Sequence, residues 1–228
     1  MGGRHVSRAV GREAEPSLGF ERVVFFSDAV FAIVITLLVL PLTAEIELPE
    51  ESTDLAHDIW RQWPRILSFV VSFLVIGQFW IAHHRMFSHL RAYDQTLIWL
   101  NLVSLLSVCF LPFPTAVLGA HSTGQDRFPV VFYAASMTVT SLCLTLAWLY
   151  AATRGRLVHP DLDRHTRRDF TVRSLATTGI FLLSVGAAAF GLYVALAFWL
   201  ILLPAVRIAL GRRHRRPDAA ESGVARAP

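Results

Sequence analysis

The chain has 228 residues, of which 54% are hydrophobic and only 17% charged, and its formal net charge is +4. So apolar a composition indicates a membrane protein with several spans rather than a soluble domain. All 21 basic residues are arginines, and they cluster between the apolar stretches. In a membrane protein such clusters are topology signals, so the positive charge does not point to nucleic acid as a partner.

The first apolar stretch covers residues 23–42, and roughly 20 helical residues are enough to cross a hydrocarbon core of about 30 Å. Ser27 and Asp28 lie inside this stretch, and Arg22 directly precedes it. Charge inside a bilayer is costly and is usually retained by function. Residues 1–21 are polar and show no signal-peptide pattern, so we expect a cytoplasmic tail there.

Residues 43–65 carry six acidic side chains and read as an extramembrane loop, with a short amphipathic piece between Pro49 and Pro64. Three further spans of about 20 to 25 residues follow, and a final apolar stretch is too long for one span. We expect that stretch to form two short spans with a break near residues 186–191. The expected spans are residues 66–86, 96–119 and 128–152, and the final stretch is residues 175–206.

Six spans place the arginine clusters on one side of the membrane, as the positive-inside rule requires. The prediction is therefore an all-α membrane protein with six transmembrane helices and both termini cytoplasmic. Residues 22–211 form its transmembrane domain, and residues 212–228 form a C-terminal tail that is first basic and then disordered.

A helical wheel of the first span places one apolar face around Ile33. Thr36 lies at the edge of this face, and Asp28 lies roughly 140° from Ile33, nearly opposite. The face could line a pore or could be the stripe that any apolar helix shows, and Asp28 could simply join helices. The members of the face are Phe26, Ala29, Val30, Ile33, Leu37 and Leu40.

The second span ends with Trp80, His83 and His84, at the depth where the first span holds Asp28. A buried aspartate needs a partner, and we expect His83 or His84 to supply it. Three interpretations of the histidine pair compete: a metal site, a titrating proton sensor and a static clamp on Asp28. Metal binding is the weakest of the three, because adjacent helical residues face different directions and no third ligand is spaced nearby. The clamp is favoured, and the proton sensor stays open.

We interpret the polar residues, prolines and cysteines of the later spans as structural, with no role in binding or catalysis. Asn101, Ser104 and Ser107 recur at three-residue spacing, which is typical of hydrogen bonding between membrane helices. Pro112 and Pro114 are expected to kink or end the third span. Cys109 and Cys143 lie within apolar stretches and suggest no disulfide framework.

The motif Arg22-x-x-x-Phe26-Ser27-Asp28, followed by Ala32-Ile33 and Thr36-Leu37, resembles the signature of the transmembrane protein 175 family of potassium channels. The element Trp80-x-x-His83-His84 is similar to that family's second recurring motif. Animal members carry two six-span repeats, so this chain resembles the single-repeat prokaryotic form. The resemblance implies a homotetramer in which the first helix of each subunit lines a central pore.

The same resemblance implies roles for individual residues. Ile33 would form an apolar constriction, with Leu37 and Leu40 on the same face, and Thr36 would contribute to ion selectivity. The sequence contains no Thr-Val-Gly-Tyr-Gly filter, so only weak preference for potassium is expected. The remaining motif residues would form a scaffold for packing and gating: Arg22, Phe26, Ser27, Asp28, Trp80, His83 and His84.

Three functional hypotheses follow. The first is a channel in the prokaryotic cell membrane for potassium and other monovalent cations, with no enzymatic activity, cofactor or bound metal. The second is a proton-coupled transporter that uses Asp28 with His83 or His84 as a protonation relay. The third, an intramembrane metalloenzyme, is disfavoured because no nucleophile or convergent acids accompany the histidines.

Overall fold

The computed structural model describes residues 18–44, 54–121 and 126–199, and within these ranges the secondary structure is helical except for one isolated bridge between Leu90 and Val158. Five helical segments are long and apolar enough to cross a membrane, which agrees with the expected all-helical membrane fold. The predicted sixth span extends beyond residue 199 and so lies outside the described residues, as do most of both predicted tails. The helices are α1 Leu18–Leu37, α2 Leu40–Ala44, α3 Leu55–Arg61, α4 Trp63–Ser88, α5 Gln95–Phe110, α6 Pro112–His121, α7 Phe128–Thr153, α8 Arg164–Ala188 and α9 Leu192–Ala197.

Prolines set several of these boundaries. Pro41 has no N–H to donate to the carbonyl of Leu37, and the first span accordingly breaks after Leu37 and resumes as α2. Pro112 has the same effect between α5 and α6, which together make the third span, Gln95–His121. The third span is therefore interrupted at Pro112 but does not end there, and Pro114 lies within α6.

Helix α1 begins at Leu18, so residues 18–21 of the expected tail are helical. One expected boundary is wrong. Helix α8 begins at Arg164, about three turns before residue 175, where apolar character begins. Hydropathy marks only the part of a helix suited to lipid, and the arginine-rich segment expected to be a loop forms the first turns of α8. The expected break near residues 186–191 is confirmed, because Gly191 has a φ of 127° between α8 and α9.

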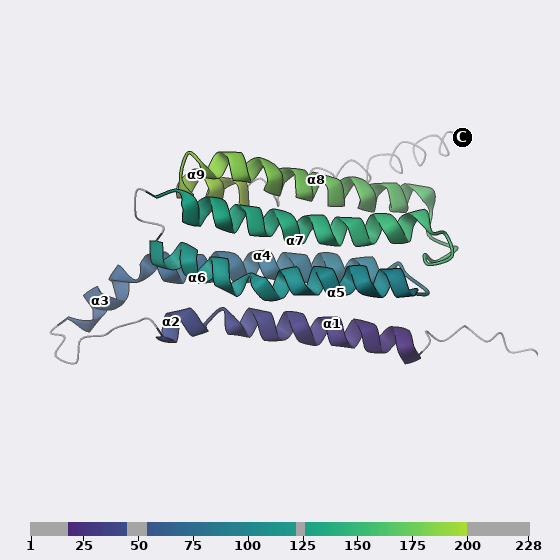
Figure 1. The fold of residues 1–228 in the computed structure, drawn as a ribbon, viewed down its shortest axis with the longest axis horizontal. Helices are drawn as coiled ribbons and strands as arrows, with labels where there is room; N and C mark the ends of the chain where they lie inside the picture. The colour runs from purple at the N-terminus through teal and green to yellow at the C-terminus, as the bar shows by residue number, and fades with distance from the viewer. Residues whose placement is uncertain (1–17, 45–53, 122–125, 200–228) are drawn as a thin grey trace, which may run out of the picture.

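The helices form a layered bundle in which α1 lies at one edge (Figure 1). Helix α1 packs against α4 and α5, α4 against α6, and α7 against both α5 and α8. The N-terminus of α1, the α4–α5 connection and the α7–α8 connection all lie at the same end of the bundle (Figure 1). Most of the described arginines lie near this end, which we call the arginine-rich end: Arg22, Arg85, Arg91, Arg154, Arg156, Arg164, Arg167, Arg168 and Arg173.

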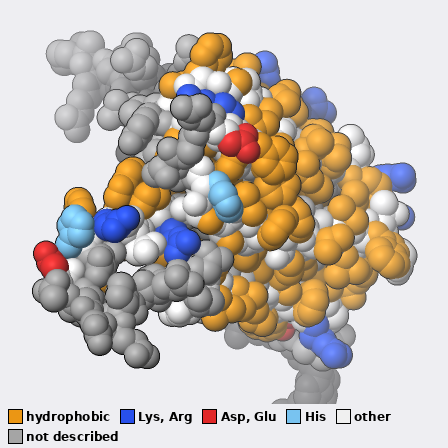
Figure 2. Space-filling model, turned by 60° about the vertical axis from the view of Figure 1, so that its left-hand side comes forward, with side chains coloured by type: hydrophobic (Ala, Val, Ile, Leu, Met, Phe, Trp, Pro, Cys, Tyr) orange, Lys and Arg blue, Asp and Glu red, His pale blue; other side chains and the backbone are white. Residues whose placement is uncertain are grey.

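Packing inside the bundle combines apolar clusters with polar contacts between helices. The hydroxyl oxygens of Tyr133 of α7 and Ser72 of α4 lie 2.9 Å apart and share a hydrogen bond. The Ser72 hydroxyl also accepts a hydrogen bond from Thr115 of α6. Trp148 of α7 donates to Thr171 of α8 at 2.8 Å. On the face drawn in Figure 2, hydrophobic side chains cover most of the part of the surface that the structure describes, as expected for helices that face lipid.

Candidate functional site

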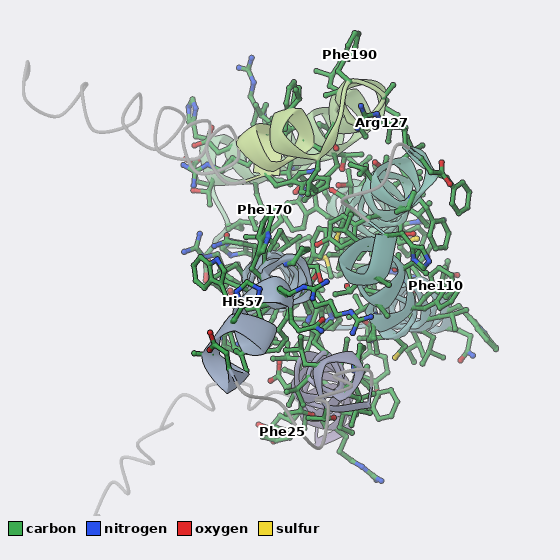
Figure 3. All side chains as sticks on the ribbon, turned by 90° about the vertical axis from the view of Figure 1, so that its left-hand side faces the viewer. Phe25, His57, Phe110, Arg127, Phe170 and Phe190 are labelled. Carbon is green, nitrogen blue, oxygen red and sulfur yellow. The ribbon has the colours of Figure 1, made fainter. Side chains whose placement is uncertain are left out.

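One face of the first span, formed by α1 and the start of α2, is exposed among the described residues; we call it the uncovered face of α1. Phe26 is 54% exposed, Ile33 58%, Leu37 39% and Leu40 53%. The opposite face buries Phe31, Val34 and Leu38 in the core. Figure 3 shows Phe25, the neighbour of Phe26, on α1 at the outer edge of the bundle. The apolar face expected from the helical wheel is therefore the face that a single subunit leaves uncovered, although Val30 at its margin is half-buried.

Thr36 lies on this uncovered face and is exposed. Its hydroxyl donates to the carbonyl of Ile33 at 2.8 Å, so within the helix the side-chain donor is already used. The hydroxyl oxygen still offers a lone pair outward. Ala29 and Ala32, also exposed, are small enough to let another helix approach closely.

Asp28 binds α4, but not through a histidine. The indole Nε1 of Trp80 donates to Asp28 Oδ1 at 2.9 Å, and the half-buried carboxylate thereby joins α1 to α4. The expectation that His83 or His84 would clamp Asp28 is therefore wrong, since the indole one helical turn nearer the start of α4 reaches it. His84 is exposed and lies against the Trp80 ring, with centroids 5.7 Å apart.

His83 instead belongs to a second, fully buried polar contact. Its Nε2 lies 2.8 Å from Asn101 Oδ1, and Asn101 Nδ2 donates to Ser27 Oγ at 3.0 Å. The ring stacks on Phe87 with centroids 4.5 Å apart. Ser27, Asn101 and His83 thus connect α1, α5 and α4, and we call them the buried triad.

The hydrogens of the buried triad can be assigned from its ends. Ser27 donates its only hydroxyl hydrogen to the carbonyl of Val23 at 2.9 Å, so its oxygen must accept from the Asn101 amide. The amide oxygen then faces His83, and Nε2 must carry a hydrogen. Two neighbouring α1 residues, Ser27 and Asp28, therefore fix the rotation of this helix against α5 and α4.

Sequence analysis singled out Ser27, Asp28, Trp80 and His83, but not their pairing: Trp80 as the partner of Asp28, and Asn101 as the link between Ser27 and His83. Asn101 was expected to hydrogen-bond between helices, and it does. Ser107 also has a side-chain hydrogen bond with Cys143 of α7, besides donating to the carbonyl of Ser104. The expectation is wrong only for Ser104, whose hydroxyl donates to the carbonyl of Leu100 in its own helix. The depth of the two residues along their helices could have predicted this pairing. His83 lies five residues before the end of α4, and Asn101 lies six residues after the start of α5, so both lie at a similar distance from the α4–α5 connection.

Arg22 is exposed near the arginine-rich end, one helical turn before Phe26 on the same side of α1 as the uncovered face. The motif residues therefore divide into two groups. Ser27, Asp28, Trp80 and His83 bind within the subunit, whereas Arg22 and Phe26 lie on the surface.

These features define a class: an all-helical membrane protein whose first span is anchored by polar contacts on one side and left uncovered on the other. The chain matches the model of the family described as "Endosomal/lysosomal potassium channel TMEM175" over residues 22–112. It is 36% identical to a potassium channel of Streptomyces collinus over 182 residues, covering 78% of this chain and 82% of that protein. The chain belongs to the TMEM175 family.

Two further comparisons agree. The crystal structure of a lysosomal potassium-selective channel TMEM175 homolog from Chamaesiphon minutus matches 84% of this chain and 98% of that chain, with a TM-score of 0.72 and 28% identity. The human endosomal/lysosomal proton channel TMEM175 is 30% identical over 217 residues, which are 87% of this chain and 42% of that protein. The resemblance inferred from the two motifs is thus confirmed, and the named relatives are ion channels rather than enzymes.

Proposed function

We propose that this protein is a potassium-permeable, weakly selective cation channel of the prokaryotic plasma membrane. Four copies of the chain assemble around a central axis, and the uncovered face of α1 from each copy lines the pore. Ile33 forms the apolar constriction, Leu37 and Leu40 extend it, and Thr36 offers a hydroxyl oxygen to passing ions. The permeant ions are potassium and other monovalent cations.

The observation that carries this proposal is the division of α1 into two faces. Residues that bind polar partners inside the subunit, Ser27 and Asp28, lie on one side, and the large apolar side chains lie uncovered on the other. A helix that only filled the core would not require two polar anchors to fix its rotation. The names of the relatives in Streptomyces and Chamaesiphon support potassium as the permeant ion.

An apolar ring conducts by a different principle from a carbonyl filter. A narrow ring of four isoleucine side chains excludes water by dewetting, and ions pass when the ring widens or becomes more polar. Without carbonyls that replace the hydration shell, discrimination between potassium and sodium is expected to be weak.

Purified protein in planar bilayers tests the constriction. Ile33→Asn makes the ring polar and Ile33→Ala widens it, so we expect both to raise single-channel conductance severalfold and to weaken ion selectivity. Leu182→Ala is the matched control, because Leu182 is a 61% exposed residue of α8, and α8 lies far from α1 in the bundle (Figure 1). Unchanged conductance and selectivity in both Ile33 variants would show that the constriction lies elsewhere.

The alternative, a proton-coupled transporter using Asp28 with His83 or His84, predicts saturating flux that Asp28→Asn abolishes. Within the described residues Asp28 and His83 have different hydrogen-bond partners, which gives a direct relay between them no support. The name of the human relative nevertheless makes protons a permeant ion to test. Currents recorded under a proton gradient without potassium separate the two: stepwise single-channel currents favour a channel, and slow saturating flux favours a transporter.

A further inference from the structure

A cavity of about 310 Å³ lies between α4, α7 and α8, in the half of the bundle nearest the arginine-rich end. Phe170 of α8 marks its position between the α8 and α4 ribbons (Figure 3). The cavity lies away from the uncovered face of α1, and the proposed channel function does not use it. Its apolar wall is formed by Phe79, Ile81, Ala82, Met86, Leu144 and Phe170.

The polar lining of the cavity favours an anion. Arg85 of α4 and Arg173 of α8 both line it, and Asp169 contributes the opposing charge. The hydroxyls of Ser141, Thr145 and Thr177 lie around the same space. Two guanidinium groups against one carboxylate leave one net positive charge beside an apolar wall, which is the combination that binds an anionic amphiphile.

His83 gives the cavity a second, independent feature. This residue is 1% exposed and is one of the residues that line the cavity, whereas its Nδ1 is itself fully buried, without a hydrogen-bond partner among the described residues. Because Nε2 carries the hydrogen that faces Asn101, Nδ1 of the neutral ring is an acceptor. A buried acceptor without a partner costs roughly 1 to 3 kcal/mol. Because Nδ1 is closed to the cavity, the hydroxyls of a ligand would instead meet those of Ser141, Thr145 and Thr177.

We propose that this cavity binds the headgroup of an anionic phospholipid from the leaflet at the arginine-rich end. The phosphate lies between Arg85 and Arg173, the headgroup hydroxyls lie against those of Ser141, Thr145 and Thr177, and the start of an acyl chain lies along the wall that contains Phe79 and Phe170. Phosphatidylglycerol has this chemistry, since it carries one negative phosphate and two free hydroxyls. Because His83 lines the cavity, the bound lipid contacts one member of the buried triad. The hydrogen bonds of the triad then connect this residue to Ser27 of α1.

Native mass spectrometry of the full chain in nanodiscs tests the proposal. We expect phosphatidylglycerol to remain bound to each subunit where phosphatidylcholine does not. Arg85→Gln and Arg173→Gln should each lower the affinity about tenfold or more, as expected for loss of a charge-assisted hydrogen bond. Two separate variants are needed so that the result does not depend on the folding of one.

Arg168→Gln is the matched control, because Arg168 is an exposed arginine on the same helix and does not line the cavity. The control should retain the lipid. Equal loss in all three variants would mean diffuse attraction to a basic surface, and retention in all three or equal binding of phosphatidylcholine would also overturn the site. Displacement of the lipid by inorganic phosphate at millimolar concentration would contradict the lipid assignment in favour of a free anion. The readout is binding, so it does not depend on whether the protein conducts ions.

Discussion

At the scale of single residues, the first span is held by two different kinds of polar contact. The carboxylate of Asp28 accepts from an indole near the surface of the subunit, whereas Ser27 binds the buried triad. Hydrogen bonds to carboxylates are stronger than neutral ones and directional, so the Trp80 contact fixes both the position and the rotation of α1. If the donor is removed, the carboxylate oxygen stays partly buried without a hydrogen bond, which costs free energy of folding.

Trp80→Phe should therefore destabilise the protein by about 1 to 2 kcal/mol, because the ring remains but the hydrogen bond to Asp28 is lost. Thermal unfolding of the purified protein in detergent measures this. Trp99→Phe is the control, since Trp99 of α5 is exposed and donates to no described residue. Equal shifts in the unfolding temperature of the two variants would mean that the indole hydrogen bond does not hold α1.

Asp94 makes a further contact at the residue scale, outside the membrane-spanning segments. It caps α5 by accepting from the backbone N–H of Leu97, and it also accepts from Tyr150 and from Arg156 at 3.0 Å. The hydrogen bond from Leu97, followed by those from Tyr150 and Arg156, lowers the pKa of the Asp94 carboxyl below its usual 3.8. This contact joins the α4–α5 connection to the end of α7 and the loop that follows it.

A lowered carboxyl pKa gives stability that is present above pH 3.8 and lost as pH falls through the folded-state value. The unfolding temperature of the wild type should therefore fall on acidification below about pH 4. Asp94→Asn should be less stable at pH 7, by about 1 kcal/mol or less given the exposure of Arg156, and should show a shallower acid slope. Asp161→Asn changes an exposed loop carboxylate and is the control; an acid slope in Asp94→Asn as steep as that of the wild type would contradict the assignment.

At the scale of elements, the ends of the spans are set by residues that cannot continue a helix. Pro41 and Pro112 each interrupt a span that resumes within a few residues. Gly191 makes a sharper break, because its φ of 127° lies where L residues other than glycine are strained. This break reverses the chain between α8 and α9, and an added Cβ there would lie 3.3 Å from Arg127 Nη1.

Gly191→Ala should destabilise the protein by about 1 to 3 kcal/mol, because the substitution forces a strained backbone conformation. Gly186→Ala is the contrasting control variant, since Gly186 lies inside α8 and an added Cβ would meet nothing within 4 Å. Alanine there should be neutral or stabilising by up to about 1 kcal/mol. Chemical or thermal unfolding compares the two; similar destabilisation by both would mean that the reversal does not depend on the glycine.

At the scale of the whole molecule, we expect the apolar surface to make two kinds of contact, with lipid and with neighbouring copies of the chain. Most of it suits lipid, whereas the uncovered face of α1 also carries Thr36 and the small residues Ala29 and Ala32. A helix intended only for lipid has no need of these residues, and neighbouring copies can approach closely where side chains are small. The proposed tetramer gives this face its partner.

The sequence predicted much of this arrangement because hydropathy and helical periodicity are local signals. Five of the expected spans and the uncovered face of α1 follow from them. The partner of Asp28 did not, since the choice between Trp80 and His83 depends on how α1 and α4 are rotated about their axes. The early start of α8 was missed because its first turns are polar, and nothing in the residue pattern separates a helix that protrudes from the membrane from a loop.

The central claim is that α1 from several subunits surrounds the ion path, and block by Cd²⁺ tests it most directly. In a background where Cys109 and Cys143 are replaced by alanine, Ile33→Cys would bring several thiols together at the constriction, and thiolates bind soft cations tightly. We predict that micromolar Cd²⁺ blocks the potassium currents of Ile33→Cys reversibly and leaves Leu182→Cys unaffected. Currents through Ile33→Cys that Cd²⁺ does not alter, or equal block of both variants, would contradict the claim.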